Sequence, residues 1–87
     1  MKDIEKILKV LANKRRLAII KLLKNRKEAN VGEIAEGIKL SFKATSRHLL
    51  QLYAVDILEK EQRSLEIFYR LSANLNHIAK YVSNFLD

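Results

Sequence analysis

The apolar residues of this chain change their spacing twice, and this change limits the folds that the chain can adopt. Through about residue 53 they recur every three or four positions, which is the period of amphipathic helices. Between residues 57 and 71 they alternate with polar residues, which is the period of β-strands. The helical period then returns. The sequence therefore predicts a mainly α fold with one β-hairpin before the last helix.

The first half of the chain predicts four helices, and polar residues mark the beginnings of three of them. Apolar residues at positions 4, 7, 8 and 11 predict the first helix. Asn13 is a candidate N-cap for a second helix that continues to about Lys24. Asn30 and Glu33 have the spacing of a capping box at the start of a short third helix. Ser41 can cap a fourth helix that runs to about residue 53.

The second half of the chain predicts a hairpin followed by a fifth helix. Residues 57–61 and 65–71 are the expected strands, and residues 62–64 are the expected turn between them. Ser72 is a candidate N-cap for the last helix, and the polar residues 25–29 are expected to form a loop. The predicted order is helix, helix, helix, helix, hairpin, helix.

The length and the absence of cysteine limit how this fold is stabilised. We expect a single domain over residues 1–87, and a chain this short has a marginal core. Without cysteine it has no disulfides, thiolate metal sites or cysteine nucleophile. Association with a second copy is the remaining way to cover the apolar stripes. No apolar run approaches the roughly 20 residues of a membrane span, so we expect a cytoplasmic protein without membrane contact.

Positive charge is concentrated in the middle of the chain. The formal net charge is +7, and residues 14–53 alone contain ten basic and three acidic side chains. A localised positive field of this kind attracts polyanions, chiefly nucleic acid. A solvated, lysine-rich helix surface would give the same composition, so charge alone leaves both interpretations open.

The third and fourth predicted helices, separated by about three residues, have the arrangement of a helix-turn-helix. At about 100° per residue, one arc of the fourth helix is apolar and is expected to face the core: Phe42, Thr45, Leu49 and Leu52. The opposite arc has no acidic residue, and its donors suit the major groove of double-stranded DNA. The candidate DNA contacts on this helix are Ser41, Lys43, Ala44, Ser46, Arg47, His48 and Gln51. His48 lies at the border of the two arcs, where a phosphate contact and a partly buried histidine are both open.

Several ordered motifs make the chain resemble the ArsR-type winged helix-turn-helix regulators. Residues 8–12 and 16–23 are similar to the opening motif LKALADPTRLRILRLL of that family. Residues 33–36 resemble its ELAE helix, residues 40–52 its LS…SRHLxxL recognition helix, and residues 67–71 its VYYRL wing strand. No single motif is specific, but their common order and spacing over about residues 7–71 make the resemblance strong.

The resemblance implies a homodimer whose first and last helices form the interface. The interface residues expected on this basis are Ile4, Ile7, Leu8, Leu11, Ile78, Val82 and Phe85. A two-fold dimer places two recognition helices about one DNA turn apart, so the operator is expected to be an imperfect palindrome. The hairpin becomes the wing, with Arg63 at its tip along the flanking DNA.

The chain departs from the family pattern at several positions. Family metal sensors carry a CVC triplet where residues 30–32 read NVG, so the thiolate site is missing. Glycines of the pattern are replaced by Lys39, Asp56 and Ser64. The residues around His77 are poor metal partners. We therefore expect no cofactor, no metal and no catalytic site.

The sequence favours a DNA-binding transcriptional regulator, most simply a repressor that acts by occupying a promoter. Two other classes of function remain as alternatives. One is a winged-helix module that binds a protein partner through its terminal helices and needs no DNA. The other is a metal- or small-molecule-responsive sensor with an unrecognised site.

Overall fold

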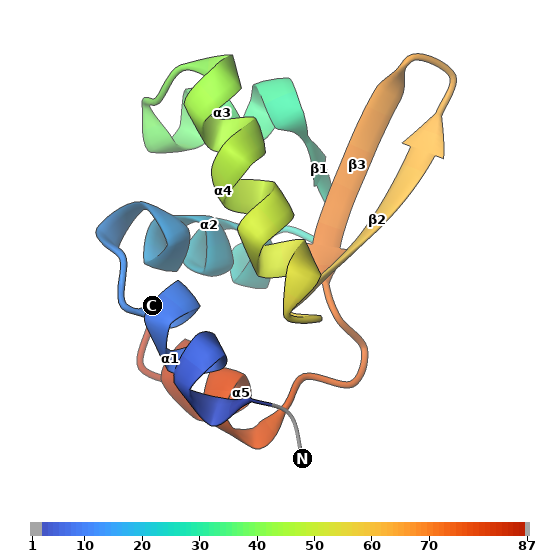
Figure 1. Cartoon of the computed structure of the whole chain (residues 1–87). Coiled ribbons are helices and arrows are strands. Elements are labelled where there is room, and N and C mark those ends of the chain that lie inside the picture. The colour runs from blue at the N-terminus through green and yellow to red at the C-terminus, as the bar shows by residue number, and fades with distance from the viewer. Residues whose placement is uncertain (1–2, 87) are drawn as a thin grey trace.

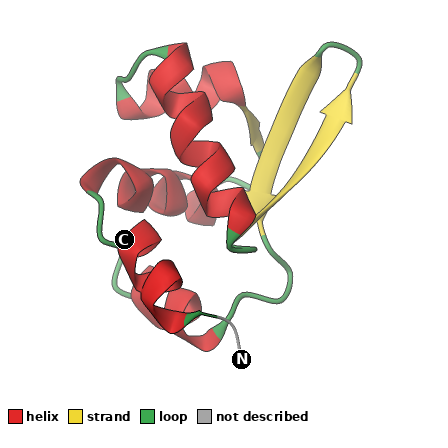
Figure 2. Ribbon diagram, in the orientation of Figure 1, coloured by secondary structure: helices red, strands yellow, loops and turns green. Residues whose placement is uncertain are grey.

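The computed structural model describes residues 3–86 and shows a winged helix-turn-helix (Figures 1 and 2). The elements follow in the order α1 (Ile4–Leu11), α2 (Lys14–Asn25), β1 (Ala29–Asn30), α3 (Val31–Ile38), α4 (Phe42–Ala54), β2 (Leu58–Arg63), β3 (Glu66–Leu71) and α5 (His77–Ser83). The predicted fold class is confirmed. The three strands form one antiparallel sheet in the order β1-β3-β2.

The helix starts that the sequence predicts are confirmed for three of the helices. The Asn13 side chain accepts hydrogen bonds from the backbone N–H groups of Arg15 and Arg16 at the start of α2. Asn30 and Glu33 form the expected capping box of α3. The Ser41 hydroxyl accepts from the backbone N–H of Ala44 in α4. Each cap depends on residues at most three positions apart, so local sequence is sufficient to determine it.

The last helix begins later than predicted. Its N-cap is Asn76, whose side chain accepts from the backbone N–H of Ala79. Ser72 instead donates its hydroxyl to the carbonyl oxygen of Asp56, which fixes the end of the hairpin against the end of α4. Residues 72–76 form a loop that leads from the base of the hairpin to α5, which lies beside α1 (Figure 1).

The hairpin differs from the prediction in its turn and in its extra partner strand. Arg63 pairs with Glu66, so the turn consists of Ser64 and Leu65 rather than residues 62–64. The expected loop before α3 ends in the short strand β1, where Ala29 pairs with Tyr69. A strand of two residues has no period to detect in a sequence, and its pairing partner lies 40 positions away.

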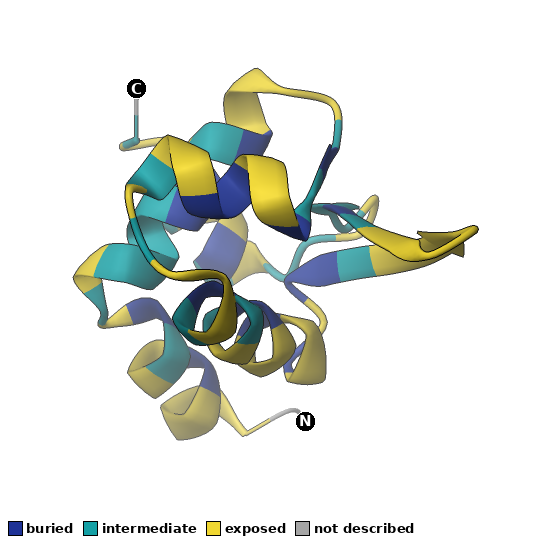
Figure 3. Cartoon of the chain, turned by 90° about the horizontal axis from the view of Figure 1, so that it is seen from above, coloured by how far each residue is buried: buried dark blue, intermediate teal, exposed yellow. Residues whose placement is uncertain are grey.

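The core lies between α2, α3, α4 and the base of the hairpin, and it continues to the inner sides of α1 and α5. Its fully buried side chains include Ile19, Ile34, Leu49, Leu52 and Ile57. The outer half of the hairpin is exposed on both strands (Figure 3).

Phe42 was predicted to face the core, and this expectation is wrong, because its side chain is 62% exposed. It is the first residue of α4, and it lines an open groove between α3 and the wing together with Leu65 and Ile67. The core contacts of α4 begin one turn later, at Thr45.

The terminal helices α1 and α5 lie side by side below the helix-turn-helix (Figure 1). Ile7 and Leu11 are only 4% exposed, so they belong to the core of this chain and have almost no surface for a partner. This placement corrects their predicted role as direct interface residues. None of the helices within residues 3–86 is long and apolar enough to cross a membrane.

Candidate nucleic-acid interface

Helix α4 presents a cationic side to the solvent and an apolar side to the core. Leu49 and Leu52 are fully buried, as the helical arc predicts. Lys43 and Arg47 are exposed on the opposite side. Neither makes a hydrogen bond or an ion pair with any group in the described part of the chain, residues 3–86. Both cations are therefore available to an external anion.

The remaining predicted contacts of α4 lie on or beside this outward side. Ser41 and Gln51 are exposed, and Ala44, Ser46 and His48 are half-buried. The Ser41 hydroxyl already serves as the N-cap, which leaves its donor for another partner. Small side chains at the helix start let the backbone approach a groove closely, and Arg47 extends from the next turn.

Arg16, at the start of α2, joins three helices through its guanidinium group. Its Nε donates to the carbonyl oxygen of Val10, and Nη2 donates to that of Lys9 at 3.3 Å, both in α1. Its Nη1 donates to Oε1 of Gln51 and lies 3.2 Å from Nδ1 of His48, both in α4. Its partners in α4 lie 32 and 35 positions away and gave no local signal.

His48 sits in a positive environment. Partial burial lowers the pKa of its imidazole below the usual value of 6.5, and the neighbouring charge of Arg16 lowers it further. The Gln51 side chain acts in the opposite direction, because it can accept a hydrogen bond from the charged ring. Burial also lowers the pKa of Arg16, although this side chain remains charged.

The wing carries paired charges. Arg63 donates to both carboxylate oxygens of Glu28, one of them at 2.8 Å, and to Glu61 at 3.0 Å. These two carboxylates raise the pKa of Arg63, and its guanidinium also lies over the ring of Phe68. Arg63 was expected at the wing tip, but it belongs to β2 and its side chain is held by Glu28. The residue at the tip is Leu65, which is 95% exposed.

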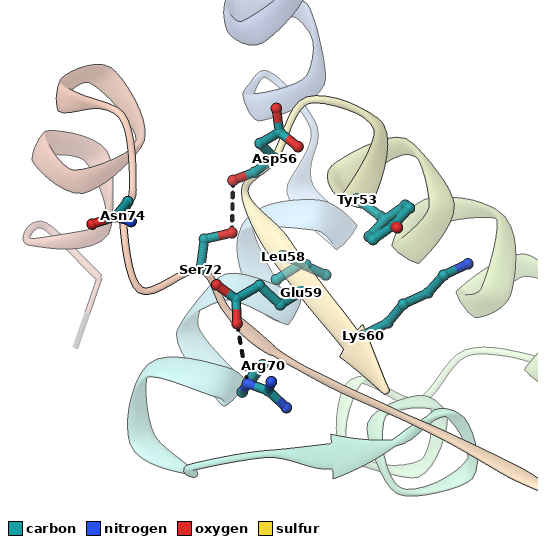
Figure 4. A pocket seen from close by; sticks show the side chains of 8 residues that line it. All are labelled: Tyr53, Asp56, Leu58, Glu59, Lys60, Arg70, Ser72 and Asn74. Atoms are coloured by element: carbon teal, nitrogen blue, oxygen red, sulfur yellow. Dashed lines mark hydrogen bonds and ion pairs between the residues drawn. The ribbon is translucent and has the colours of Figure 1, made fainter. Parts of the chain in front are cut away.

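A shallow pocket of about 460 Å³ lies between the end of α4 and the base of the hairpin (Figure 4). Its polar groups bind one another. Arg70 donates from Nε to Glu59 at 3.2 Å, and Ser72 donates to the carbonyl oxygen of Asp56. Lys60 places its ammonium group 4.4 Å from the ring centre of Tyr53. These contacts explain the pocket as a junction between α4 and the wing.

Among residues 3–86, three adopt a left-handed backbone: Lys39, Asp56 and Ser64, with φ angles of 58°, 63° and 58°. These are the three positions where the sequence lacks a glycine of the family pattern. The turns that the pattern requires are therefore retained, although side chains other than glycine are strained in this region.

The structure offers no candidate metal centre within residues 3–86, where no three potential ligands of the His, Cys, Asp or Glu types come together. At the place of the missing cysteine triplet, the Asn30 side chain is used by the capping box of α3.

Taken together, the short turn between α3 and α4, the exposed cations of α4 and the hairpin define a winged helix-turn-helix with a cationic recognition helix. Comparison with known proteins agrees. Residues 13–60 match the family described as "Bacterial regulatory protein, arsR family". This chain belongs to the arsR family, which comprises transcription regulators and not enzymes.

Named relatives support this assignment. The chain is 36% identical over 67 residues to the "Transcriptional activator HlyU" of Vibrio cholerae serotype O1, an alignment that covers 77% of this chain and 61% of the relative. The chain thus spans less than two thirds of that relative's length. The structure of reduced HlyU from Vibrio cholerae N16961 has a TM-score of 0.79 at 32% identity, covering 94% of this chain and 82% of that one.

Two further solved structures share the fold. The transcriptional repressor PagR of Bacillus anthracis gives a TM-score of 0.78 at 28% identity, with 95% of this chain and 91% of that chain covered. The homodimeric winged helix-turn-helix DNA-binding domain Mb0332 from Mycobacterium bovis also gives 0.78, at 24% identity, with 94% and 72% covered. At that identity the second likeness concerns the fold alone.

Proposed function

We propose that this protein is a homodimer that binds double-stranded DNA sequence-specifically and regulates transcription, with α4 in the major groove. The observation that carries the proposal is the two-sided character of α4. Thr45, Leu49 and Leu52 are buried on one side of the helix. Lys43 and Arg47 are exposed on the other side, without partners among residues 3–86. Arginine and lysine in this position reach guanine acceptors or phosphates.

The other side chains of α4 have secondary roles in this proposal. Leu50 is half exposed beside Arg47 and can contact the methyl group of thymine. Ser41, Ala44 and Ser46 line the approach of the helix start to the DNA. Arg63 contributes less, because its charge is compensated by Glu28 and Glu61.

The terminal helices supply the dimer interface in this proposal. Four exposed apolar side chains remain on α1 and the α5 region after packing within the chain: Ile4, Leu8, Tyr81 and Phe85. The rings of Tyr81 and Phe85 meet edge to face, with centres 5.0 Å apart. Exposed apolar side chains on two neighbouring helices favour association. Ile78 and Val82 lie half-buried beneath it and pack against the core.

The proposed direction of regulation is repression, because occupancy of a promoter by a bound dimer is sufficient for it. The named relatives include one activator and one repressor, so their names do not decide the direction. The test is a reporter assay that uses an operator selected from random DNA. The operator is placed over a promoter in one reporter and upstream of it in another, and each reporter shows whether the protein raises or lowers transcription. Activation with the operator over the promoter would contradict repression by occupancy.

The main test is a DNA-binding measurement on the double variant Lys43→Ala/Arg47→Ala. We expect an affinity lower by about 1–3 kcal/mol for each lost specific contact, and a smaller dependence of affinity on salt. Lys21→Ala is the matched control, since it removes an exposed cation from α2 and leaves the outward side of α4 intact. Equal affinities in the double variant and the unmodified protein would reject α4 as the DNA-contacting helix.

The same experiment separates the two main classes of function. Operators selected from random DNA should be imperfect palindromes if a two-fold dimer binds. A protein that forms dimers but binds no duplex at low salt would instead be an interaction module.

A further inference from the structure

A small cavity lies beside the outward side of α4, toward the start of α2. Its volume is about 240 Å³, and it is lined by Arg16, Ala44, Arg47, His48 and Gln51. One water needs only about 15 Å³ of such space, so a tetrahedral oxyanion has ample room. The cavity is open on one side, next to the exposed Arg47.

The lining of this cavity is positive and contains no carboxylate. The charged groups that face His48 are Arg15 and Arg16 from α2 and Arg47 from α4. Arg16 cannot easily turn away, because two carbonyl oxygens of α1 hold its guanidinium. The cavity is therefore preorganised for a negative group before any ligand arrives.

The contact between Arg16 and His48 determines the protonation of the ring. A guanidinium group can only donate, so Nδ1 of His48 must accept at the observed 3.2 Å. The ring is then neutral, with its hydrogen on Nε2. Oε1 of Gln51 also accepts from Arg16, and it is the nearby group that stabilises a charged ring.

We propose that this cavity is an anion site for a phosphate group of the DNA backbone, and that His48 takes up a proton when the site is filled. The inference deepens the proposed function and rests on it. A phosphate oxygen beside the ring offsets the repulsion from the three arginines and favours the imidazolium form. The new Nδ1–H donates to Oε1 of Gln51 in place of Arg16. The guanidinium of Arg16 stays on the α1 carbonyl oxygens through Nε and Nη2, its Nη1 donates to the phosphate, and the proton comes from solvent.

Linkage then makes DNA affinity depend on pH. Because the bound state holds more protons, the affinity increases as pH falls from the pKa of His48 in the complex toward its lower pKa in the free protein. The affinity changes by up to about tenfold per pH unit for each proton taken up. At pH values above the higher pKa or below the lower pKa, DNA affinity no longer changes with pH through His48.

The test measures the affinity for a selected operator between about pH 5 and 8 at constant salt, the range in which histidine titrates. The variant His48→Asn keeps an acceptor for Arg16 but cannot titrate, and we expect it to lose the pH dependence. The sequence has one other histidine, His77, exposed at the start of α5. His77→Asn is the matched control and should retain the full pH dependence.

A second measurement follows the two imidazole rings directly by NMR. We expect the pKa of His48 to rise when operator DNA is added, and the signals of the His77 ring serve as the internal reference. Inorganic phosphate is the comparison ligand. If millimolar phosphate alone produces the same rise and competes with DNA, the site takes free phosphate rather than the backbone of DNA.

The outcomes distinguish this inference from the proposed function. Strong DNA binding with the same pH dependence in His48→Asn would overturn the inference and leave the proposed function intact. Absence of DNA binding at every pH would overturn the proposed function. In that case a constant His48 pKa on addition of phosphate would also reject the anion site, and a rise would retain it for free phosphate.

Discussion

Replacing Thr45 by valine should stabilise this protein. Thr45 is fully buried in α4, and its Oγ1 makes no hydrogen bond with any group in residues 3–86. A buried hydroxyl without a partner costs about 1–3 kcal/mol of folding free energy. Valine has nearly the same shape and a similar helix propensity, so the substitution removes this cost without leaving a cavity. We expect a gain of about 1–2 kcal/mol.

The assay is thermal and urea unfolding at a fixed protein concentration, because the proposed dimer would gain stability with concentration. For a domain of this size each kcal/mol raises Tm by about 4–8 °C. Thr45→Ser is the control, because it keeps the hydroxyl and loses a methyl group, and it should cost about 1 kcal/mol. DNA affinity should stay constant in both variants. A Thr45→Val protein less stable than the original would show that the hydroxyl is bonded, most simply to the carbonyl oxygen one helical turn back.

Four further predictions concern surface residues. Phe85→Glu should shift the protein to monomers in analytical ultracentrifugation, because it places a charge in the proposed interface. Leu65→Glu at the wing tip should leave the dimer intact, and a dimeric Phe85→Glu protein would place the interface elsewhere. Glu28→Gln should tighten DNA binding in a titration, since it removes one of the two carboxylates that hold Arg63 and a negative charge near the wing. Unchanged affinity would mean that Arg63 does not reach DNA. Arg63 lowers the pKa of the Glu28 carboxyl below its usual 4.5. The stability that this pair contributes is therefore present above pH 4.5 and is lost as pH falls through the lowered pKa. Glu28→Gln should lack this loss of stability when unfolding is measured against pH in acid. Lys39→Gly should raise stability by up to about 1 kcal/mol in urea unfolding, because relief of the left-handed strain exceeds the added chain entropy, and a loss would mean that the entropy dominates.

Much of the fold could be predicted because its signals are local. The caps at Asn13, Asn30 and Ser41 each involve residues within three positions, and the change of period identified the hairpin. The side of α4 that faces the core followed from helical geometry alone. The exception was Phe42, because the period of a helix does not reveal where the neighbouring elements stop covering it.

The candidate site was only partly predictable, since its contacts join distant parts of the chain. The sequence identified Lys43 and Arg47, whose exposure follows from their position on α4. It did not reveal that Arg16 holds Gln51 and His48, or that Glu28 holds Arg63 35 positions away. A charge count treats each of these arginines as equally available.

The sequence by itself determined the order of elements, the starts of α2, α3 and α4, and a recognition helix with one cationic side, because hydrogen bonds and periodicity within a few residues specify these features. Only the tertiary structure decided which charges are available to a ligand and which apolar residues remain for a partner. The physical reason is that neutralisation and burial depend on what packs against a side chain. Ile7 and Phe85 are both apolar residues of terminal segments, yet packing buries the first and leaves the second 69% exposed.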